Sequence, residues 1–116
     1  MTYEHKINAA GKKLGRVSSE AAKVLLGKHS AQFENNKVAD VKVVIENASK
    51  LDFSDRKKVG EVRKRYSGYP GGQKVETLGA FLGRKGGKGA LELAVKRMLP
   101  NNRLLKNRLK NLIISE

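Results

Sequence analysis

The chain has 116 residues and carries 25 lysines and arginines against 11 acidic residues, which gives a net charge of +14. Thirty of the 116 residues are leucine, isoleucine, valine or phenylalanine, enough to predict one folded domain over residues 1–116. The absence of cysteine excludes a disulfide scaffold, a thiolate metal site and cysteine catalysis. Its apolar runs are too short for a membrane span and its first residues lack the apolar core of a signal peptide, so we expect a soluble intracellular protein.

The first third of the chain is predicted to form a strand and a helix. Tyr3–Asn8 is a short extended segment. Helical spacing follows in the apolar residues Val17, Ala21, Val24 and Leu25. We expect Ser18 or Ser19 to cap the start of this helix and Gly27 to end it in the left-handed conformation.

Two more extended segments are predicted in the middle of the chain. Val41–Asn47 contains three consecutive β-branched apolar residues, a pattern that predicts a strand covered on both faces. Lys57–Tyr66 is far more polar, and its run Arg63–Arg65 is too charged for a core. We therefore expect this second segment to be an edge strand or a protruding arm.

The C-terminal half is predicted to be helical, with glycines between the helices. Thr77 can cap a short helix that runs through Leu82 and ends at Gly83. A second helix follows the next glycines and stops at Pro100. Its apolar face consists of Leu91, Ala94, Val95, Met98 and Leu99.

A basic helix and a last strand are predicted at the end of the chain. Asn101 or Asn102 can cap the helix, which extends to Asn111, and Leu112–Ile114 is a plausible strand. Strands that alternate with helices predict an α/β fold with a mainly parallel sheet.

The positive charge is concentrated in the second half of the chain. Residues 1–55 have a net charge of +2, whereas residues 56–116 have a net charge of +12. Because such a field opposes compaction, an anionic partner is expected. Nucleic acid is the favoured partner, with acidic lipid, polyphosphate and a merely solubilising excess of lysine as alternatives.

The segment Ser67–Lys74 predicts a tight loop, since it contains three glycines and a proline among eight residues. Tyr66 and Tyr69 offer flat rings that could stack on bases. The alternative is an ordinary turn whose tyrosines pack into the core. The cations that flank the loop, and that we expect at RNA phosphates, are Arg63, Lys64, Arg65 and Lys74.

A second glycine-rich segment, Gly83–Gly89, is similar to a phosphate-binding loop but fails its spacing. Only three residues separate its first glycine from the Gly-Lys pair, and Gly89 follows where a hydroxyl should bind magnesium. The segment is better explained as a flexible basic loop, either merely solvated or reaching RNA phosphates. Its cations are Arg84, Lys85 and Lys88.

The basic helix before the last strand is the third candidate. We expect its outward cations to contact phosphates, with a membrane-surface helix or a plain solvated face as alternatives. These cations are Arg103, Lys106 and Arg108. His5 and His29 lie far apart in the sequence and predict no metal site. We find no catalytic residues and expect no cofactor, small-molecule substrate or membrane partner.

Several sequence blocks together resemble bacterial-type large ribosomal subunit protein thirteen. They keep the order of that family and cover residues from about 5 to 114. They are Gly11-Lys12-Lys13-Leu14-Gly15-Arg16, Gly27-Lys28-His29, Val43-Val44-Ile45-Glu46-Asn47-Ala48, Ser67-Gly68-Tyr69-Pro70-Gly71-Gly72 and Ala94-Val95-Lys96-Arg97-Met98-Leu99-Pro100. Cations and a histidine within these blocks complete the candidate RNA contacts: Arg16, Lys28, His29, Lys96 and Arg97.

The resemblance implies a three-layer α/β/α fold with a four-stranded, mainly parallel sheet. It also implies a structural, non-enzymatic role on the large ribosomal subunit in the cytoplasm, bound to large-subunit ribosomal RNA beside neighbouring ribosomal proteins and joining early in assembly. One departure is that the segment after Pro100 lacks the glycine that the family usually shows, with an arginine, before its last helix. The alternatives are a free regulatory protein that binds DNA or messenger RNA, and a phosphate-handling enzyme that the loop spacing disfavours.

Overall fold

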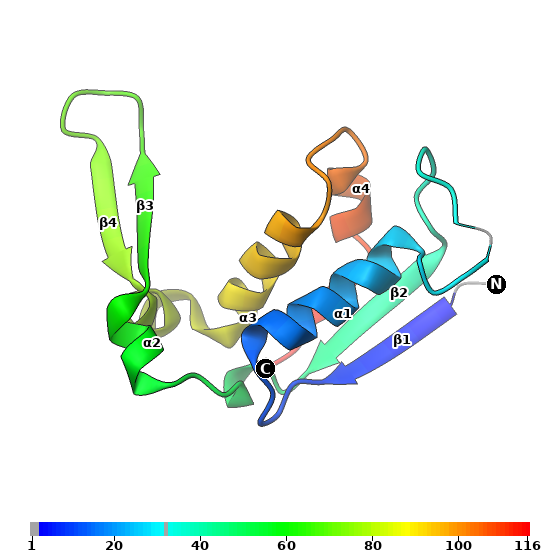
Figure 1. Ribbon diagram of the computed structural model, residues 1–116, viewed down its shortest axis with the longest axis horizontal. Coiled ribbons are helices and arrows are strands. Elements are labelled where there is room, and N and C mark those ends of the chain that lie inside the picture. The colour runs from blue at the N-terminus through cyan, green and yellow to red at the C-terminus, as the bar shows by residue number, and fades with distance from the viewer. Residues whose placement is uncertain (1–2, 32) are drawn as a thin grey trace.

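The computed structural model of the protein describes residues 3–31 and 33–116 (Figure 1). The elements follow the chain in this order: β1 (Tyr3–Asn8), α1 (Leu14–Leu26), β2 (Val41–Glu46), the 3₁₀ helix η1 (Ala48–Lys50), α2 (Asp55–Gly60), β3 (Val62–Tyr66), β4 (Gln73–Thr77), α3 (Leu78–Met98), α4 (Leu105–Leu109) and β5 (Leu112–Ile114). The mixed α/β class predicted from the sequence is confirmed.

Strands β1, β2 and β5 form a parallel sheet with β2 in the centre. The register places His5 beside Val43, Ile7 beside Ile45, and Ile45 beside Ile114. These residues share one face of the sheet, on which all but the half-buried His5 are buried. The predicted extended segments at both ends of the chain and the central strand are therefore confirmed.

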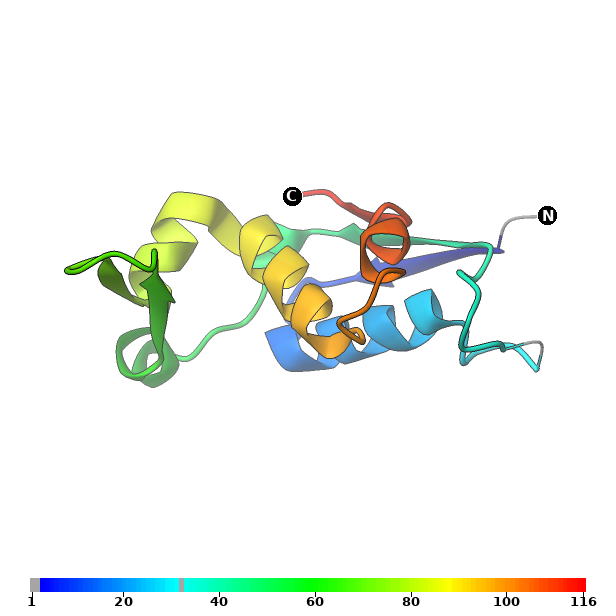
Figure 2. The ribbon, with the colours of Figure 1, turned by 90° about the horizontal axis from the view of Figure 1, so that it is seen from above.

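The opposite face of this sheet is covered by no element in the described part of the chain. Helix α1 and the second half of α3 pack on the same face, so the sheet and helices form two layers rather than three (Figure 2). The expectation that the central strand is covered on both faces is wrong, because its alternate residues are polar or only half-buried. The residues on the open face include Glu4, Lys6, Lys42, Val44, Glu46 and Ile113.

The remaining predicted extended segment, Lys57–Tyr66, is not part of the parallel sheet. The first part of Lys57–Tyr66 belongs to helix α2, where the Ser54 hydroxyl accepts a hydrogen bond from the backbone N–H of Lys57 at 3.2 Å. The rest is β3, which pairs antiparallel with β4. The parallel sheet of the described residues therefore has three strands, not the four that the resemblance implies. The physical reason is charge, since a central strand would bury the run Arg63–Arg65.

Strands β3 and β4, residues Val62–Thr77, project from the molecule as an arm (Figure 1). The arm contributes to a radius of gyration of 15.5 Å, compared with about 13 Å expected for a compact chain of this length. The molecule is also flat, with extents of 47, 36 and 18 Å. The prediction of a protruding arm is confirmed, and the arm places cations away from the core.

The hydrophobic core lies between the sheet and helices α1 and α3. Helix α1 begins at Leu14 after Lys13, which makes no side-chain cap, so the predicted serine cap is wrong and Ser18 is instead buried inside the helix. The end of α1 is as predicted, because Gly27 adopts a φ of 88°. The larger side chains that are fully buried in the core include Leu25, Val43, Ile45, Leu91 and Val95.

Helix α3 consists of two helical parts that meet at a kink at Gly86, where φ is 71° and ψ is −177°, so the two predicted helices are present but divide at Gly86 rather than at Gly83. The Thr77 hydroxyl accepts a hydrogen bond from the Ala80 N–H at 3.2 Å, which confirms the predicted cap. The segment Gly83–Gly89 is not the predicted loop, because it is helical on both sides of the break. Gly87 packs directly on η1, and a β-carbon there would overlap the carbonyl oxygen of Ala48.

This contact gives a matched pair of predictions. We expect Gly87→Ala to lower the free energy of unfolding by about 1–3 kcal/mol, because the new methyl group forces α3 away from η1. We expect Gly83→Ala to raise it by about 0.5–1 kcal/mol, since that helical glycine has open space around it. Urea unfolding of both variants measures the difference, and equal effects would contradict the close contact.

Candidate nucleic-acid interface

The arm has one strongly basic face. Its register places Arg63 opposite Glu76 and Arg65 opposite Lys74, and side-chain alternation puts all four residues on the same face. This inner face is turned toward α3, because Glu76 binds Arg84 of that helix. The inner face therefore holds three cations and one carboxylate, and the carboxylate is already engaged.

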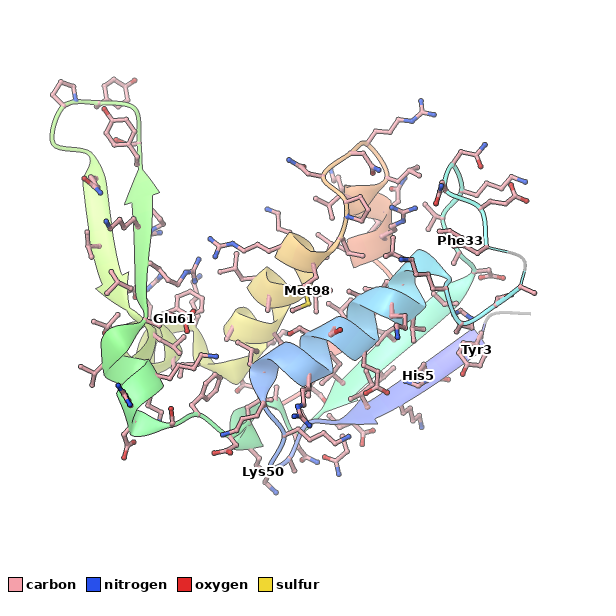
Figure 3. The ribbon with its side chains drawn as sticks, in the orientation of Figure 1. Tyr3, His5, Phe33, Lys50, Glu61 and Met98 are labelled. Atoms are coloured by element: carbon pink, nitrogen blue, oxygen red, sulfur yellow. The ribbon has the colours of Figure 1, made fainter. Side chains whose placement is uncertain are left out.

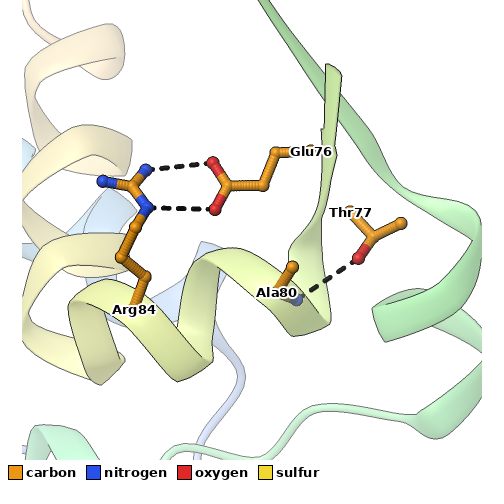
Figure 4. A network of polar contacts seen from close by, with 4 residues as sticks. All are labelled: Glu76, Thr77, Ala80 and Arg84. Atoms are coloured by element: carbon orange, nitrogen blue, oxygen red, sulfur yellow. Dashed lines mark hydrogen bonds and ion pairs between the residues drawn. The ribbon is translucent and has the colours of Figure 1, made fainter. Parts of the chain in front are cut away.

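Two contacts anchor the arm to α3. Arg84 donates from Nη2 to Glu76 Oε2 at 2.9 Å and from Nε to Glu76 Oε1 at 3.1 Å, a paired geometry that fixes both side chains (Figure 4). In the second contact, the guanidinium of Arg63 lies 4.1 Å from the centre of the Phe81 ring. Arg84 approaches the same ring at 5.6 Å. The base of the arm is thus held by one ion pair and a shared aromatic ring.

Three pKa values are shifted around this anchor, and that of Arg84 is raised by its hydrogen bonds to Glu76. Burial lowers the pKa of Arg63, and the nearby cations Arg97, Arg65 and Arg84 lower it further, while Glu76 opposes them. The hydrogen bonds from Arg84 hold the pKa of Glu76 below its ordinary value, although burial works in the opposite direction. The single carboxylate of Glu76 does not balance the positive charge of the surrounding arginines, so the binding of an anion here is favoured.

The tip of the arm exposes two aromatic rings. Tyr66 is 68% exposed and Tyr69 is 74% exposed, so the alternative in which these tyrosines pack into the core is wrong. Gly68 and Gly71 have positive φ values of 89° and 72°, as a tight turn requires. Stacking of the tyrosines on bases stays a prediction, but nothing in the described chain covers them.

The predicted cations of β3 do not all lie on the same face of the arm. Lys64 lies opposite Val75 on the outer face of the arm, with Tyr66 on the same face of β3. The outer face holds no other charged residue, and its Val62 and Val75 are 45% and 60% exposed. The structure thus separates Lys64 from the inner cations with which the sequence grouped it.

Helix α3 adds exposed cations and a pocket. Lys85, Lys88, Lys96 and Arg97 are all exposed. A pocket of about 420 Å³ is lined by Arg63 of the arm, by Lys85 and Lys96 of this helix, and by side chains of α4 and β5. The structure therefore brings together cations that are more than twenty residues apart in the sequence, and side chains from the arm and α3 enter the concave region between them (Figure 3).

The basic helix near the end of the chain contributes fewer cations than expected. Arg103 and Lys106 are exposed, as predicted for phosphate contacts. Arg108 is only 1% exposed, and its Nη2 donates to the carbonyl oxygen of Asn35 at 3.4 Å. Because the guanidinium is buried, Arg108 is not available to a phosphate in this structure, and we omit it from the proposed interface.

The remaining candidates lie on α1 or just beyond its end. Arg16 is exposed near the start of α1, and Lys28 and His29 are exposed just beyond its end. His29 stacks on Tyr3 with ring centres 4.6 Å apart, and Tyr3 lies at the far side of the molecule from Glu61 at the base of the arm (Figure 3). Lys28 and His29 therefore lie apart from the arm, whereas Arg16 is near the start of α1, where Leu14 lines a pocket with Arg63 and Arg97.

The sequence carries no functional signal for three residues that shape the interface: Phe81, Glu76 and Glu92. Phe81 is not among the candidates from the sequence, although its ring contacts the guanidinium groups of Arg63 and Arg84. Glu76 and Arg84 are eight residues apart across the junction of β4 and α3, a spacing that matches no helical or strand pattern. Glu92 is a pocket residue only because α3 turns its exposed face toward the arm.

No group of three or more histidine, cysteine or carboxylate side chains that could hold a metal ion occurs among residues 3–31 and 33–116. None of the described helices has the length and apolar character needed to cross a membrane.

Comparison with known proteins gives a consistent set of relatives. A family model described as ribosomal protein L13 matches residues 2–115. The large ribosomal subunit protein uL13 of Symbiobacterium thermophilum is 43% identical over 98 residues, covering 84% of this chain and 68% of the relative. The proteins of the same name from Natranaerobius thermophilus and Staphylococcus carnosus are 42% and 40% identical, covering 91% and 93% of this chain and 73% and 74% of the relatives.

The anchor of the arm predicts a pH dependence. Because the pKa of Glu76 is lowered by folding, its ion pair contributes stability that is fully present above the ordinary glutamate pKa of about 4.3 and is lost as the pH falls through the lowered value. We expect hydrogen exchange of the arm amides, relative to that of β2, to accelerate over that acidic range.

The variant Glu76→Gln should show the loosened arm already at neutral pH and lose the acidic transition. Glu34→Gln is the matched control, since Glu34 pairs with Lys37 at 2.9 Å in a loop outside the arm. An arm whose exchange is the same in Glu76→Gln as in the unchanged chain would contradict the anchor.

Proposed function

The chain belongs to the ribosomal protein L13 family, and we propose that it holds large-subunit ribosomal RNA between the inner face of the arm and the exposed face of α3. As a member of this family it is a structural component of the large ribosomal subunit and not an enzyme. The relatives come from bacteria, in which this subunit is cytoplasmic.

One observation carries the proposal. Arg65 and Lys74 lie directly opposite each other on neighbouring strands of the arm. Like charges at directly opposite positions destabilise a strand pair, and here no carboxylate separates the two. A hairpin that places its cations in this way is suited to an anionic partner that compensates them. A phosphate backbone, with its regular negative charges, is such a partner.

The division of charge supports the same function. The segments that build the sheet and α1 are nearly neutral, whereas residues 56–116 have a net charge of +12. A rigid core can therefore position the arm and α3 while their cations bind phosphates from separate RNA segments. Holding such segments at a fixed distance is how the protein would contribute to early subunit assembly.

Exposed side chains outside the inner face of the arm and α3 offer further contacts to the RNA. Tyr66 and Tyr69 at the tip are available to stack on unpaired bases, which is the usual way in which proteins contact single-stranded RNA. Arg103 and Lys106 extend the basic surface beyond α3. Residues 1–116 act as one domain in this proposal, with the neighbouring ribosomal proteins at surfaces that the RNA leaves free.

The salt dependence of RNA binding tests the proposal. Each neutralised phosphate adds about 0.7–0.9 to the slope of log affinity against log salt concentration. We expect Arg65→Met combined with Lys74→Met to reduce that slope by about 1.4–1.8 for a fragment of large-subunit ribosomal RNA. Filter binding over a series of salt concentrations measures the slope.

The control is Lys6→Met combined with Lys42→Met, which removes the same charge from the open face of the sheet. We expect its slope to equal that of the unchanged chain. Equal losses in the two double variants would mean that net charge alone drives binding, and no loss in the arm variant would remove the arm from the interface.

A further inference from the structure

The pocket between the arm and α3 has the size and composition of a small-ligand site. Its volume of about 420 Å³ lies within the range of about 300–1,000 Å³ that is typical of such sites. Four elements line it: β3 of the arm, α3, α4 and β5. Because distant parts of the chain meet there, the pocket belongs to the tertiary fold and not to one loop.

The wall of the pocket combines three kinds of chemistry. Cations stand on two sides, Arg63 from the arm and Lys85 and Lys96 from α3. The apolar part includes Leu93 and Leu109, both half-buried. Such a pocket suits a ligand that has one anionic end and one flat apolar body.

The only carboxylate in the lining is Glu92. It lies four residues before Lys96 on the exposed face of α3, yet no ion pair joins Glu92 to any residue that the structure describes. A carboxylate that is left uncompensated beside cations is available to accept hydrogen bonds from the N–H groups of a ligand.

The cationic side of the pocket lacks an anion. The guanidinium of Arg63 stacks on Phe81 at 4.1 Å, and its Nε and Nη1 atoms are shielded from solvent without a hydrogen-bond partner in the described chain. Arg97 and Arg84 add positive charge around it. An anionic group that enters between Arg63 and the two lysines would offset this concentration of charge.

We propose that the pocket holds a single unstacked nucleotide of the bound RNA, with its phosphate among Arg63, Lys85 and Lys96 and its base against Leu93 and Leu109. Glu92 accepts hydrogen bonds from the edge of the base, which favours guanine because guanine presents two N–H donors side by side to one carboxylate. This inference rests on the proposed function, because the nucleotide belongs to the same RNA.

The location of the pocket supports this occupant over a free metabolite. Arg63 of the arm and Lys85 and Lys96 of α3 line the pocket, and Arg65 and Lys74 share the inner face of the arm with Arg63. A strand that follows these cations therefore passes the pocket. Sequence-specific contacts to RNA mostly use unstacked bases in this manner. A nucleotide within the strand then enters without a separate association step.

The test uses the full chain labelled with ¹⁵N and titrated with 5′-GMP, 5′-UMP and inorganic phosphate. We expect GMP to shift the amide signals of Gly89, Leu93 and Leu109, which line the pocket, while those of Gly68 and Gly71 at the tip stay in place. We expect phosphate alone to shift the signals near Lys85 and Lys96 but not that of Leu109. Identical shifts with GMP and phosphate would overturn the proposal.

Two variants separate base recognition from simple charge attraction. Glu92→Gln should weaken GMP binding by about tenfold, the loss expected for charge-assisted hydrogen bonds, while it strengthens phosphate binding because a negative charge is removed. Lys96→Met should weaken the binding of both. If Glu92→Gln strengthens GMP and phosphate binding alike, Glu92 does not contact the base and the proposal fails.

The two proposals can fail separately. If the ribosomal RNA fragment binds with the salt slope described above but GMP leaves the pocket signals unchanged, the nucleotide pocket is wrong and the proposed function stands. If the arm variant also leaves the salt slope of the fragment unchanged, both are wrong.

Discussion

Repulsion among the cations of residues 56–116 is the constraint on which the rest of the structure depends. Sixteen lysines and arginines share this stretch with four acidic residues. The chain separates them by extending the arm away from the core and by breaking α3 at Gly86. Where cations must lie close together, at the base of the arm, the carboxylate of Glu76 and the ring of Phe81 are placed among them. The molecule is consequently flat and open, and its positive charge lies where a polyanion can reach it.

The core tolerates this arrangement because it is built from both ends of the chain. Strand β5 returns to pair with β2. The arm is therefore an insertion in the chain between the first two strands of the parallel sheet and its last strand. Gly87 allows α3 to lie directly on η1, which brings the second half of the helix onto α1. The helix therefore connects the core with the basic surface. A displacement of α3 would move Lys85 and Lys96 relative to the arm, so packing and RNA contact depend on the same element.

Elements with a local signal could be predicted from the sequence. Tyr3–Asn8 and Leu112–Ile114 form strands with the predicted bounds, and Gly27 ends α1 because the left-handed conformation favours glycine. Features that depend on tertiary contacts could not be predicted from the sequence. Ser18 resembles a helix cap but is buried one turn inside α1, and Arg108 resembles a surface cation but is buried against the loop at Asn35.

In the candidate interface, too, the sequence predicts which residues are involved but not how they are arranged. The cations of the arm and of α3 could be singled out by composition, but their grouping depends on strand register and on the turn of a helix. Lys64 and Arg65 are adjacent in the sequence and point to opposite faces of the arm. Gly83–Gly89 is rich in glycine and was predicted as a loop, yet only Gly86 departs from helical geometry there. Packing against η1 supplies the stability that glycine propensity lacks.

The most direct test of the account is cleavage of ribosomal RNA by a tethered hydroxyl-radical probe. Because the chain has no cysteine, Lys74→Cys on the inner face of the arm and Lys42→Cys on the open sheet face each give one attachment point. Both variants are incorporated into large subunits, which are isolated by sedimentation before the probe is activated. The account predicts discrete cleavage of large-subunit ribosomal RNA from position 74 and much weaker cleavage from position 42. Stronger cleavage from position 42, or protein that sediments apart from the large subunit, would contradict it.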